Sequence, residues 1–288
     1  MSIQTVGIIG AGTMGTGIAQ VCASTGIDVI VQDIGAGALE RSVATVRSQL
    51  DKQVARGKLE EAARDAALAR IRTTPDPAGL AAADIVIEAA TENETLKLEI
   101  LARVEALLRP ETIIATNTSS ISITRLAAGL ARPGRVVGMH FFNPVPVMAL
   151  VEIIRGLRTD EATVATVTTL AERLGKTPIG VRNSAGFVVN RILCPMINEA
   201  VFALQEGLAS AEEIDAGMRL GCNHPIGPLA LCDLIGLDVE LAVMEVLYSN
   251  FNDPKYRPAP LLREMVDAGL LGRKAGRGFY DYAKAGKA

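Results

Sequence analysis

The chain has 288 residues, 49% of them hydrophobic and 21% charged, a composition that is typical of a folded globular protein and excludes a disordered one. Its 29 Lys and Arg against 32 Asp and Glu give a net charge of −3, so we expect no nucleic-acid partner, which would require a basic surface. We expect no membrane partner either, because a spanning helix needs about 20 mostly apolar residues in succession.

The first 180 residues alternate short Ile- and Val-rich runs with helical segments. Such runs predict strands that are buried on both faces. Alternation of strands and helices is typical of an α/β protein with a parallel, doubly wound sheet. The expected strands cover residues 6–10, 29–33, 85–89, 113–117, 136–140, 151–154 and 179–181, and the expected helices cover 13–25, 38–56, 60–71, 94–108, 124–129 and 161–174.

The pattern changes after residue 186, where no convincing strand follows and residues 187–206, 211–220 and 236–250 predict helices. We therefore predict a doubly wound α/β domain over 1–184 and an all-helical domain over 185–288. The helix expected over 187–206 is apolar nearly all round, and such a helix is buried against another surface. One small domain has little surface with which to bury this helix, so we expect part of the helix to lie in a subunit interface.

A nucleotide signature lies between the first strand and the first helix, where Gly10-Ala11-Gly12-Thr13-Met14-Gly15 is a G-x-G-x-x-G motif. The first glycine permits the tight turn, the second lets the backbone approach a pyrophosphate, and the third lets helix and strand pack closely. The N-terminus of the helix supplies N–H groups and positive partial charge to the phosphates. The motif therefore predicts a dinucleotide site.

Asp33 selects between the two nicotinamide dinucleotides. It lies 18 residues after Gly15, at the end of the next expected strand, where a carboxylate accepts both ribose hydroxyls of NAD. The same charge would repel the 2′-phosphate of NADP, and residues 34–40 contain no Arg or Lys to offset that repulsion. NAD is the expected cofactor.

His140 and Glu152 form the expected acid–base pair. His140 ends one expected strand and Glu152 opens the next, so a hairpin in which paired residue numbers sum to about 292 would place them opposite each other. A carboxylate beside an imidazole fixes its tautomer and stabilises its protonated form. The competing base is His224, in a turn before a helical segment, where a role in helix entry is the alternative.

Polar residues beyond two expected strands are further candidates, because ligands bind outside the carboxyl ends of strands in open parallel sheets. Ser119 and Glu92 have this position. Ser119 could instead cap the helix that follows, as could its neighbouring serines. Asn190 lies on the mostly apolar helix, where a buried amide needs partners.

Lys52 and Arg56 are one helical turn apart and share a helix face, which suits either phosphate binding or a solvated surface.

Six stretches in chain order resemble the short-chain (S)-3-hydroxyacyl-CoA dehydrogenases, most closely the bacterial 3-hydroxybutyryl-CoA dehydrogenases. Together they extend over nearly the whole chain, and six ordered motifs are far more specific than one fingerprint. They are VGIIGAGTMG at 6–15, TNTSS at 116–120, GMHFFNP at 138–144, GFVVNR at 186–191, NHPIGP at 223–228 and LGRKAGRGFY at 271–280.

The resemblance implies a Rossmann-type NAD-binding domain over 1–184 and a helical substrate and dimerisation domain over 185–288. It also implies a homodimer with the active site between the two domains. It implies reversible oxidation of a (S)-3-hydroxyacyl-CoA, such as 3-hydroxybutyryl-CoA, to the 3-ketoacyl-CoA with NAD, a step of fatty acid and butanoate metabolism. His140 then matches the catalytic histidine and Glu152 its acidic partner. The other matched residues are Ser119 and Asn190 for the substrate, Glu92, Lys97, Asn117, Ser119, Asn143 and Lys274 for the cofactor, and Lys52 and Arg56 for the phosphates of coenzyme A.

Two other functions remain open at this stage. The same scaffold could oxidise a free hydroxy acid, or the chain could be an NAD-binding protein without catalysis.

The cysteines and histidines bear on metals and location. With two histidines and four well-separated cysteines, the chain predicts no metal site and small buried thiols in a reducing compartment. A strand signal begins at residue 5 and leaves no room for a targeting peptide, so a cytoplasmic location is expected. The cysteines are Cys22, Cys194, Cys222 and Cys232.

Overall fold

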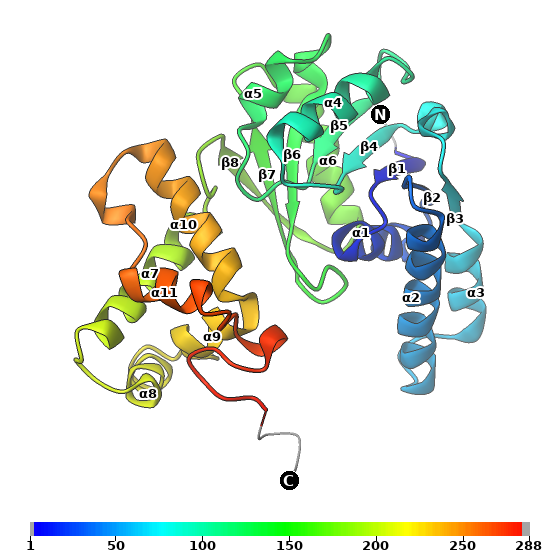
Figure 1. The fold of residues 1–288 in the computed structure, drawn as a ribbon. Helices are drawn as coiled ribbons and strands as arrows, with labels where there is room; N and C mark the ends of the chain where they lie inside the picture. Colours follow the sequence, from blue (N-terminus) through cyan, green and yellow to red (C-terminus); the bar gives the residue numbers. More distant parts are fainter. Residues whose placement is uncertain (1–2, 284–288) are drawn as a thin grey trace. The chain divides into compact units, whose positions relative to one another are not determined.

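The computed structural model describes residues 3–283 and divides into two compact units, Met1–Ser184 and Ala185–Ala288 (Figure 1). The first unit contains strands and helices, whereas the second is helical apart from isolated bridges near its end. Among the helices within residues 3–283, none combines the length and the apolarity needed to cross a bilayer.

The first unit is built on one sheet, with eight strands in the described residues, in the order β3-β2-β1-β4-β5-β6-β7-β8. The strands from β3 to β6 are parallel, whereas β7 pairs antiparallel with β6, and β8 pairs parallel with β7. The order 3-2-1-4-5-6 is that of a dinucleotide-binding fold, so the predicted fold class is confirmed. The strands are β1 Thr5–Ile9, β2 Asp28–Gln32, β3 Ile71–Thr74, β4 Ile85–Glu88, β5 Ile113–Thr116, β6 Val136–Phe141, β7 Leu150–Arg155 and β8 Thr177–Arg182.

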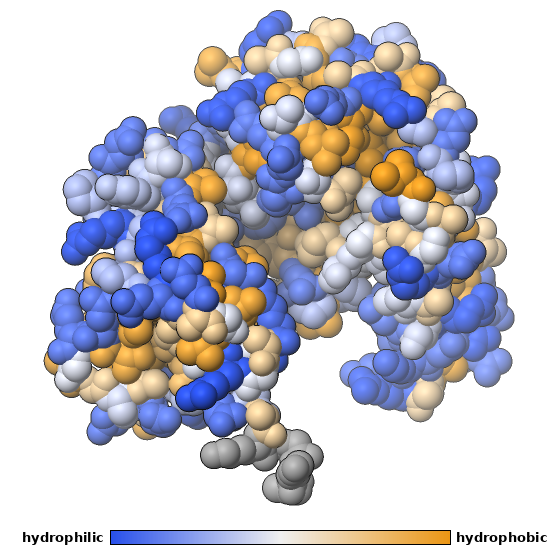
Figure 2. All heavy atoms as spheres, in the orientation of Figure 1, coloured by the Kyte–Doolittle hydropathy of each residue, from blue (hydrophilic) through white to orange (hydrophobic). Residues whose placement is uncertain are grey.

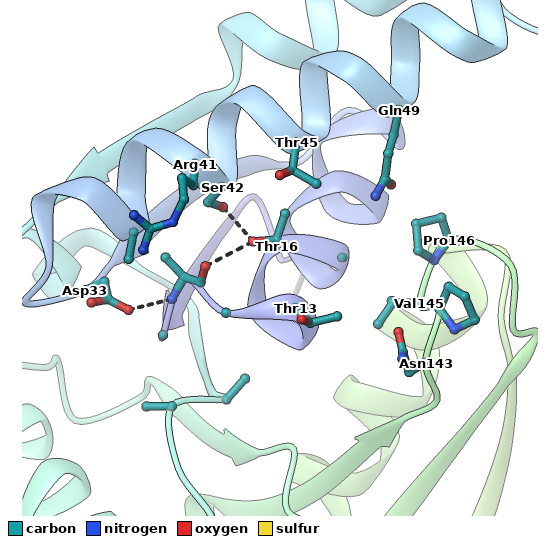
Figure 3. Close-up of a pocket in the computed structure, with 18 residues that line it drawn as sticks. Thr13, Thr16, Asp33, Arg41, Ser42, Thr45, Gln49, Asn143, Val145 and Pro146 are labelled. Atoms are coloured by element: carbon teal, nitrogen blue, oxygen red, sulfur yellow. Dashed lines mark hydrogen bonds between the residues drawn. The ribbon is translucent and has the colours of Figure 1, made fainter. Parts of the chain in front are cut away.

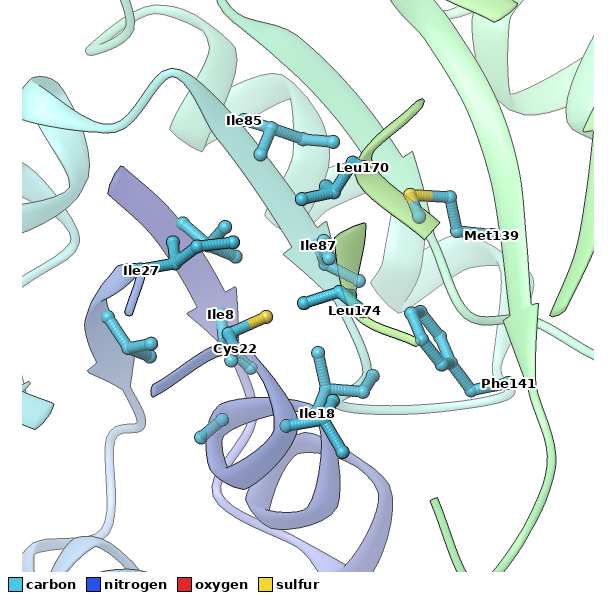
Figure 4. Close-up of a cluster of buried hydrophobic side chains, with 14 of the residues drawn as sticks. Ile8, Ile18, Cys22, Ile27, Ile85, Ile87, Met139, Phe141, Leu170 and Leu174 are labelled. Carbon is cyan, nitrogen blue, oxygen red and sulfur yellow. The ribbon is translucent and has the colours of Figure 1, made fainter. Parts of the chain in front are cut away.

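Alternate residues of the strands form the main hydrophobic core with helices α1 and α6. Ile8 and Ile87 point from neighbouring strands towards Ile18 and Cys22 of α1, and Phe141 of β6 lies in the same cluster (Figure 4). The strand residues between them are buried as well, so both faces of the sheet are covered, which explains why the strands have continuous apolar runs. The helices of this unit are α1 Thr13–Ser24, α2 Ala36–Ala55, α3 Glu61–Ala69, α4 Glu94–Glu105, α5 Ile123–Ala128 and α6 Glu161–Arg173.

The prediction over residues 60–71 was wrong at its end. The helix stops at Ala69, and Ile71–Thr74 form the edge strand β3, which pairs with β2. Its sequence Ile-Arg-Thr-Thr is half-exposed and polar, so it lacks the apolar run by which the other strands are recognised. Residues 71–74 form a strand only because they pair with β2.

The second unit has five helices in its described part. The sequence analysis gave no bounds for α9 and did not predict α11; both have eight residues and begin with a proline, which fits the first position of a helix. The carboxylate of Asp215 accepts the N–H groups of Leu229 and Ala230 and so caps α9 from another helix. The helices are α7 Val189–Gln205, α8 Ala211–Gly221, α9 Pro228–Ile235, α10 Leu237–Phe251 and α11 Pro260–Asp267.

All four cysteines are free thiols, and three of them are buried as predicted. The prediction was wrong for Cys222, which is exposed because it follows the last residue of α8 and precedes a turn in which Asn223 has a φ of 56°.

Glu240 of α10 is a buried carboxyl group in the core of the second unit. Neither of its oxygens accepts a hydrogen bond from an N–H or O–H group of the described residues. Burial raises the pKa of Glu240 from 4.5 to about 8, and the Cys194 thiol offsets this only in part. Burial likewise raises the pKa of the Cys194 and Cys232 thiols. This cluster is therefore uncharged at neutral pH.

We predict that Glu240 makes the chain less stable as the pH rises. Because the folded chain keeps a proton that the unfolded chain releases above pH 4.5, the free energy of unfolding should fall from about pH 4.5 to about pH 8. The Glu240→Gln side chain cannot ionise, so the free energy of unfolding of this variant should exceed that of the wild type by up to about 3 kcal/mol at pH 7. Urea unfolding at pH 5 and pH 8 measures the difference, with the exposed Glu199→Gln as control. If the difference in free energy of unfolding between Glu240→Gln and the wild type does not increase with pH, the prediction is wrong.

Candidate active site

A groove of about 520 Å³ opens over the nucleotide signature (Figure 3). The helix α1 starts at its floor without a side-chain cap and without an acidic residue in its first turn, so its N-terminal N–H groups are available to an anion. The hydroxyl of Thr16 donates to Ser42 and ties α1 to α2 beside the groove. The lining includes Gly10, Gly12, Thr13, Asp33, Arg41, Thr45, Gln49 and Asn143.

The three glycines of the signature have the uses that the sequence analysis expects. Gly10 has a φ of +100°, and a Cβ there would meet the backbone of Ala89 and Ala90. A Cβ at Gly15 would overlap the carbonyl oxygen of Gly10. A Cβ at Gly12 would touch nothing within 4 Å and would instead fill the groove, which is the space that a pyrophosphate needs. Thr13 lines the same space, whereas the side chain of Met14 packs against the core.

Asp33 lies at the carboxyl end of β2 with its side chain fixed by two backbone groups. Its Oδ2 accepts the N–H of Ala11 at 2.8 Å and its Oδ1 accepts the N–H of Gly35 at 2.8 Å. Each carboxylate oxygen has two lone pairs, so both can still accept a ribose hydroxyl.

Arg41 is a residue that the sequence analysis missed. Residues 34–40 contain no Arg or Lys, but α2 brings Arg41 back over the groove on the same side as Asp33 (Figure 3). Helical periodicity after Asp33 was the signal that could have found it.

A second hollow, of about 420 Å³, continues the groove past Asp33. Gly10, Asp33 and Ala90 line both hollows. The second is mostly apolar, as an adenine ring requires, and its walls include Ile34, Pro77, Leu96 and Ile100. The side chain of Ile34 is 91% exposed and is therefore accessible to a ring bound in this hollow.

His140 and Glu152 lie opposite each other on β6 and β7, in the register that the predicted hairpin requires. The Nδ1 atom of His140 is 2.7 Å from Oε2 of Glu152. His140 is 7% exposed and Glu152 is fully buried, so water screens the pair little. A carboxylate at this distance makes Nδ1 the protonated nitrogen, and the neutral ring then has its lone pair on Nε2.

Two asparagines belong to the same edge of the sheet. The side chain of Asn117, beyond β5, accepts the N–H of Phe141 at 2.8 Å and so fixes the end of β6 next to His140. Asn143 follows β6 and lines the groove over α1. The polar residues beyond β5 and β6 are thus brought together with the nucleotide signature.

Ser119 and Glu92 also meet at this edge. The N–H and the hydroxyl of Ser119 donate to Oε1 of Glu92, at 2.6 and 2.8 Å. The cap of the helix that follows is Ser122, whose side chain accepts the N–H of Arg125, so the alternative role of Ser119 as helix cap is wrong. Lys97 lies behind Glu92 and is 1% exposed.

Lys52 lies on an exposed stripe of α2 that borders a hollow of about 420 Å³. The stripe includes Arg47, which the sequence analysis missed, and Asp51, which forms an ion pair with Arg64. Arg56 is the exposed cap of α2 one turn after Lys52. The surface over this end of α2 is mostly hydrophilic (Figure 2).

Three predicted residues belong to the second unit. Asn190 is half-buried at the start of α7, and Lys274 donates to Asp238 at 2.7 Å. His224 lies in the loop before α9, where its N–H donates to the carbonyl of Met218. Over residues 3–283, no group of three His, Cys, Asp or Glu side chains is placed to hold a metal ion.

Comparison with known families identifies this arrangement. Residues 5–184 match the family described as 3-hydroxyacyl-CoA dehydrogenase, NAD binding domain, and residues 186–282 match its C-terminal domain. The chain belongs to the 3-hydroxyacyl-CoA dehydrogenase family. Its first unit is therefore an NAD-binding domain.

Individual relatives extend the comparison over the whole chain. A probable 3-hydroxybutyryl-CoA dehydrogenase of Deinococcus radiodurans is 51% identical over 96% of this chain and 99% of the relative. The 3-hydroxybutyryl-CoA dehydrogenase of Bradyrhizobium diazoefficiens is 50% identical over 98% and 97%. The crystal structure of (S)-3-hydroxybutyryl-CoA dehydrogenase from Ralstonia eutropha has a TM-score of 0.96 and 64% identity, and the match covers 98% of this chain and 100% of that one.

We predict that NADH is preferred over NADPH. Asp33→Ala should reduce this preference at least about tenfold, because the variant loses the carboxylate that accepts the ribose hydroxyls of NADH and no longer repels the 2′-phosphate of NADPH. Arg41 would remain to meet that phosphate. The measurement is kcat/KM for both cofactors. Glu40→Ala is the matched control, because Glu40 is an exposed carboxylate on α2 that does not line the groove. A wild type that is faster with NADPH would refute the assignment.

Proposed function

We propose that the chain interconverts (S)-3-hydroxybutyryl-CoA and acetoacetyl-CoA, with NAD as hydride carrier. The observation that carries this proposal is the buried pair of His140 and Glu152 at the edge of the sheet where the dinucleotide groove also opens. Oxidation of a secondary alcohol needs a base for the hydroxyl proton and a hydride acceptor next to it. The names of the relatives supply the substrate class.

His140 is the acid–base residue in this proposal. Its Nε2 accepts the proton of the 3-hydroxyl during oxidation and returns it to the ketone oxygen during reduction. NAD, when bound, supplies the hydride acceptor. Glu152 holds the Nδ1–H of the ring and stabilises the imidazolium that forms, because a buried carboxylate is a strong partner for a buried cation.

We predict that His140→Ala lowers kcat about 10²–10⁴-fold, the usual effect of losing a positioned acid–base group, with NADH binding retained. Glu152→Gln keeps an acceptor for Nδ1 but removes the charge that stabilises the imidazolium, so kcat should fall in this variant as well. The two effects should not multiply in the double variant, because the residues act as one unit.

The assay is oxidation of NADH with acetoacetyl-CoA. The control variant is His224→Ala, which tests whether the competing histidine is the acid–base residue. A wild type without turnover would exclude the proposed function. Near wild-type kcat in His140→Ala, together with a large loss in His224→Ala, would transfer the role to His224. Turnover of free hydroxy acids in preference to acyl-CoA would favour the other enzyme function.

We further propose that Lys52 and Arg56 bind the phosphates of coenzyme A, with Arg47 as an additional cation on the same helix. Changing Lys52 and Arg56 to Ala should raise KM for acetoacetyl-CoA about tenfold or more and leave kcat nearly unchanged, since phosphate contacts are equal in ground and transition states. The difference should shrink in high salt. The control is the double variant Arg70→Ala, Arg109→Ala, which removes two cations near the amino ends of strands. An unchanged KM would refute the assignment.

We propose a homodimer through the second unit. Val188 and Ile192 are one helical turn apart at the start of α7 and are 40% and 66% exposed. Adjacent exposed apolar side chains of this size are typical of a subunit interface. We propose a cytoplasmic location as well, since the cysteines are free thiols, the state that a reducing compartment maintains.

Sedimentation at micromolar concentration should show a dimer for the wild type and a monomer for Ile192→Asp. Leu157→Asp, at an 86% exposed position of the first unit, should remain dimeric. A monomeric wild type would refute the proposal.

A further inference from the structure

Lys176 is a buried lysine that the proposed mechanism does not use. It lies between α6 and β8 and is 9% exposed. Its Nζ donates to the carbonyl oxygens of Val145 at 2.6 Å and Met148 at 2.9 Å. Burial lowers the pKa of Lys176, and no carboxylate of residues 3–283 forms an ion pair with it. Because burying an ammonium group without a counter-ion costs free energy, these two hydrogen bonds have to offset that cost.

The loop that Lys176 binds, residues 142–149, connects β6 with β7. It contains two prolines, Pro144 and Pro146, which have no N–H group. Two N–H groups at the tip of the loop both donate to the carbonyl of Pro144, which closes a turn. A buried carbonyl group without a donor is unfavourable, so the ammonium of Lys176 supplies donors that the loop itself does not provide.

The same loop forms one wall of the dinucleotide groove, which residues 143–146 line. Asn143, Val145 and Pro146 lie on the side of the groove away from Asp33 (Figure 3). Val145 is 2% exposed and packs against α1, since a Cβ on Gly17 would lie 2.8 Å from the Cβ of Val145. The position of the loop therefore sets the width of the groove beside the helix whose N-terminus faces the phosphates.

We propose that Lys176 is a positioning residue for the dinucleotide groove. Lys176 does not line the groove, but its ammonium group holds residues 142–149 in place, and the loop contacts the cofactor. Without the two hydrogen bonds the loop takes up other positions, and only the molecules with the wall in place bind NADH. This inference rests on the proposed function for NADH as the ligand and needs no assumption about the substrate.

Lys176→Met tests the proposal, because the variant keeps an apolar side chain in the core and loses both hydrogen bonds. The Kd of NADH should rise about tenfold, as for a loop that is in position about one-tenth of the time. The KM for NADH should rise with it. The kcat should stay within about threefold of the wild-type value, because the pairing of β6 with β7 still holds His140 opposite Glu152. Unchanged NADH affinity in Lys176→Met would overturn the proposal.

Hydrogen exchange locates the effect of the variant. In Lys176→Met the N–H groups of Val147 and Met148 should exchange faster, because the turn that they close is no longer held. Exchange in the central strands β1 and β4 should stay at the wild-type rate. Faster exchange in these strands and in the loop alike would show that Lys176 only stabilises the fold, and the positioning role would be wrong.

Arg173→Met is the matched control. Arg173 is the last residue of α6 and donates to the carbonyl of Ile3, which precedes β1 and so lies at the amino end of the strands, away from the groove. The variant loses the same kind of hydrogen bond and should leave NADH affinity unchanged. If it weakens NADH binding as much as Lys176→Met does, the effect comes from reduced stability and the proposal fails.

A second variant keeps the test open if Lys176→Met does not fold. The side chain of Lys176→Gln is uncharged and shorter but still donates N–H groups, so the Kd of NADH should rise less, by about threefold. In that case, unchanged NADH affinity in Lys176→Gln would overturn the proposal.

The proposed function is tested separately in the same preparations. NADH affinity is measured by fluorescence without substrate, so the role of Lys176 can be determined even if acetoacetyl-CoA is not reduced. A wild type that binds NADH without reducing acetoacetyl-CoA counts against the proposed function, whereas unchanged NADH affinity in the Lys176 variants counts against the positioning role.

Discussion

The antiparallel pairing of β6 with β7 is the constraint on which the candidate active site depends. In the parallel part of the sheet, each strand must leave its carboxyl end and return by a crossover, so residues close in sequence do not pair there. Residues 142–149 reverse the chain instead, and the returning strand brings Glu152 directly opposite His140. The pair lies at the carboxyl edge of β6, next to the turn of the nucleotide signature. One change of strand direction thus adds acid–base chemistry to a cofactor site.

Buried carboxylates are compensated according to their surroundings. Glu88 receives two backbone N–H groups, a hydroxyl and an ammonium, and Glu152 receives an imidazole N–H. Glu240 has no such donor among the described residues, and its pKa rises to about 8. Charge is therefore retained where partners hold it and lost where burial acts alone. The two compensated groups lie at the candidate site, which indicates that buried charge is used there to orient side chains.

The dinucleotide groove has one part that suits phosphates and another part that suits an apolar ring. The start of α1 offers uncapped N–H groups to phosphates, whereas the hollow beyond Asp33 is mostly apolar. Asp33 borders both parts and is itself held by Ala11 and Gly35. The backbone that binds the phosphates therefore also fixes the residue that recognises the ribose.

Local features of the sequence determined much of this protein: the α/β class, seven strands, the nucleotide signature with Asp33, and the register of His140 with Glu152, which follows because a short connection limits how a hairpin can pair. Other features depend on contacts between distant segments. The edge strand β3 forms only because β2 pairs with it, and α9 begins where Asp215 caps it. The enclosure of Lys97 by Glu88 arises from packing of separate elements, which no local pattern records.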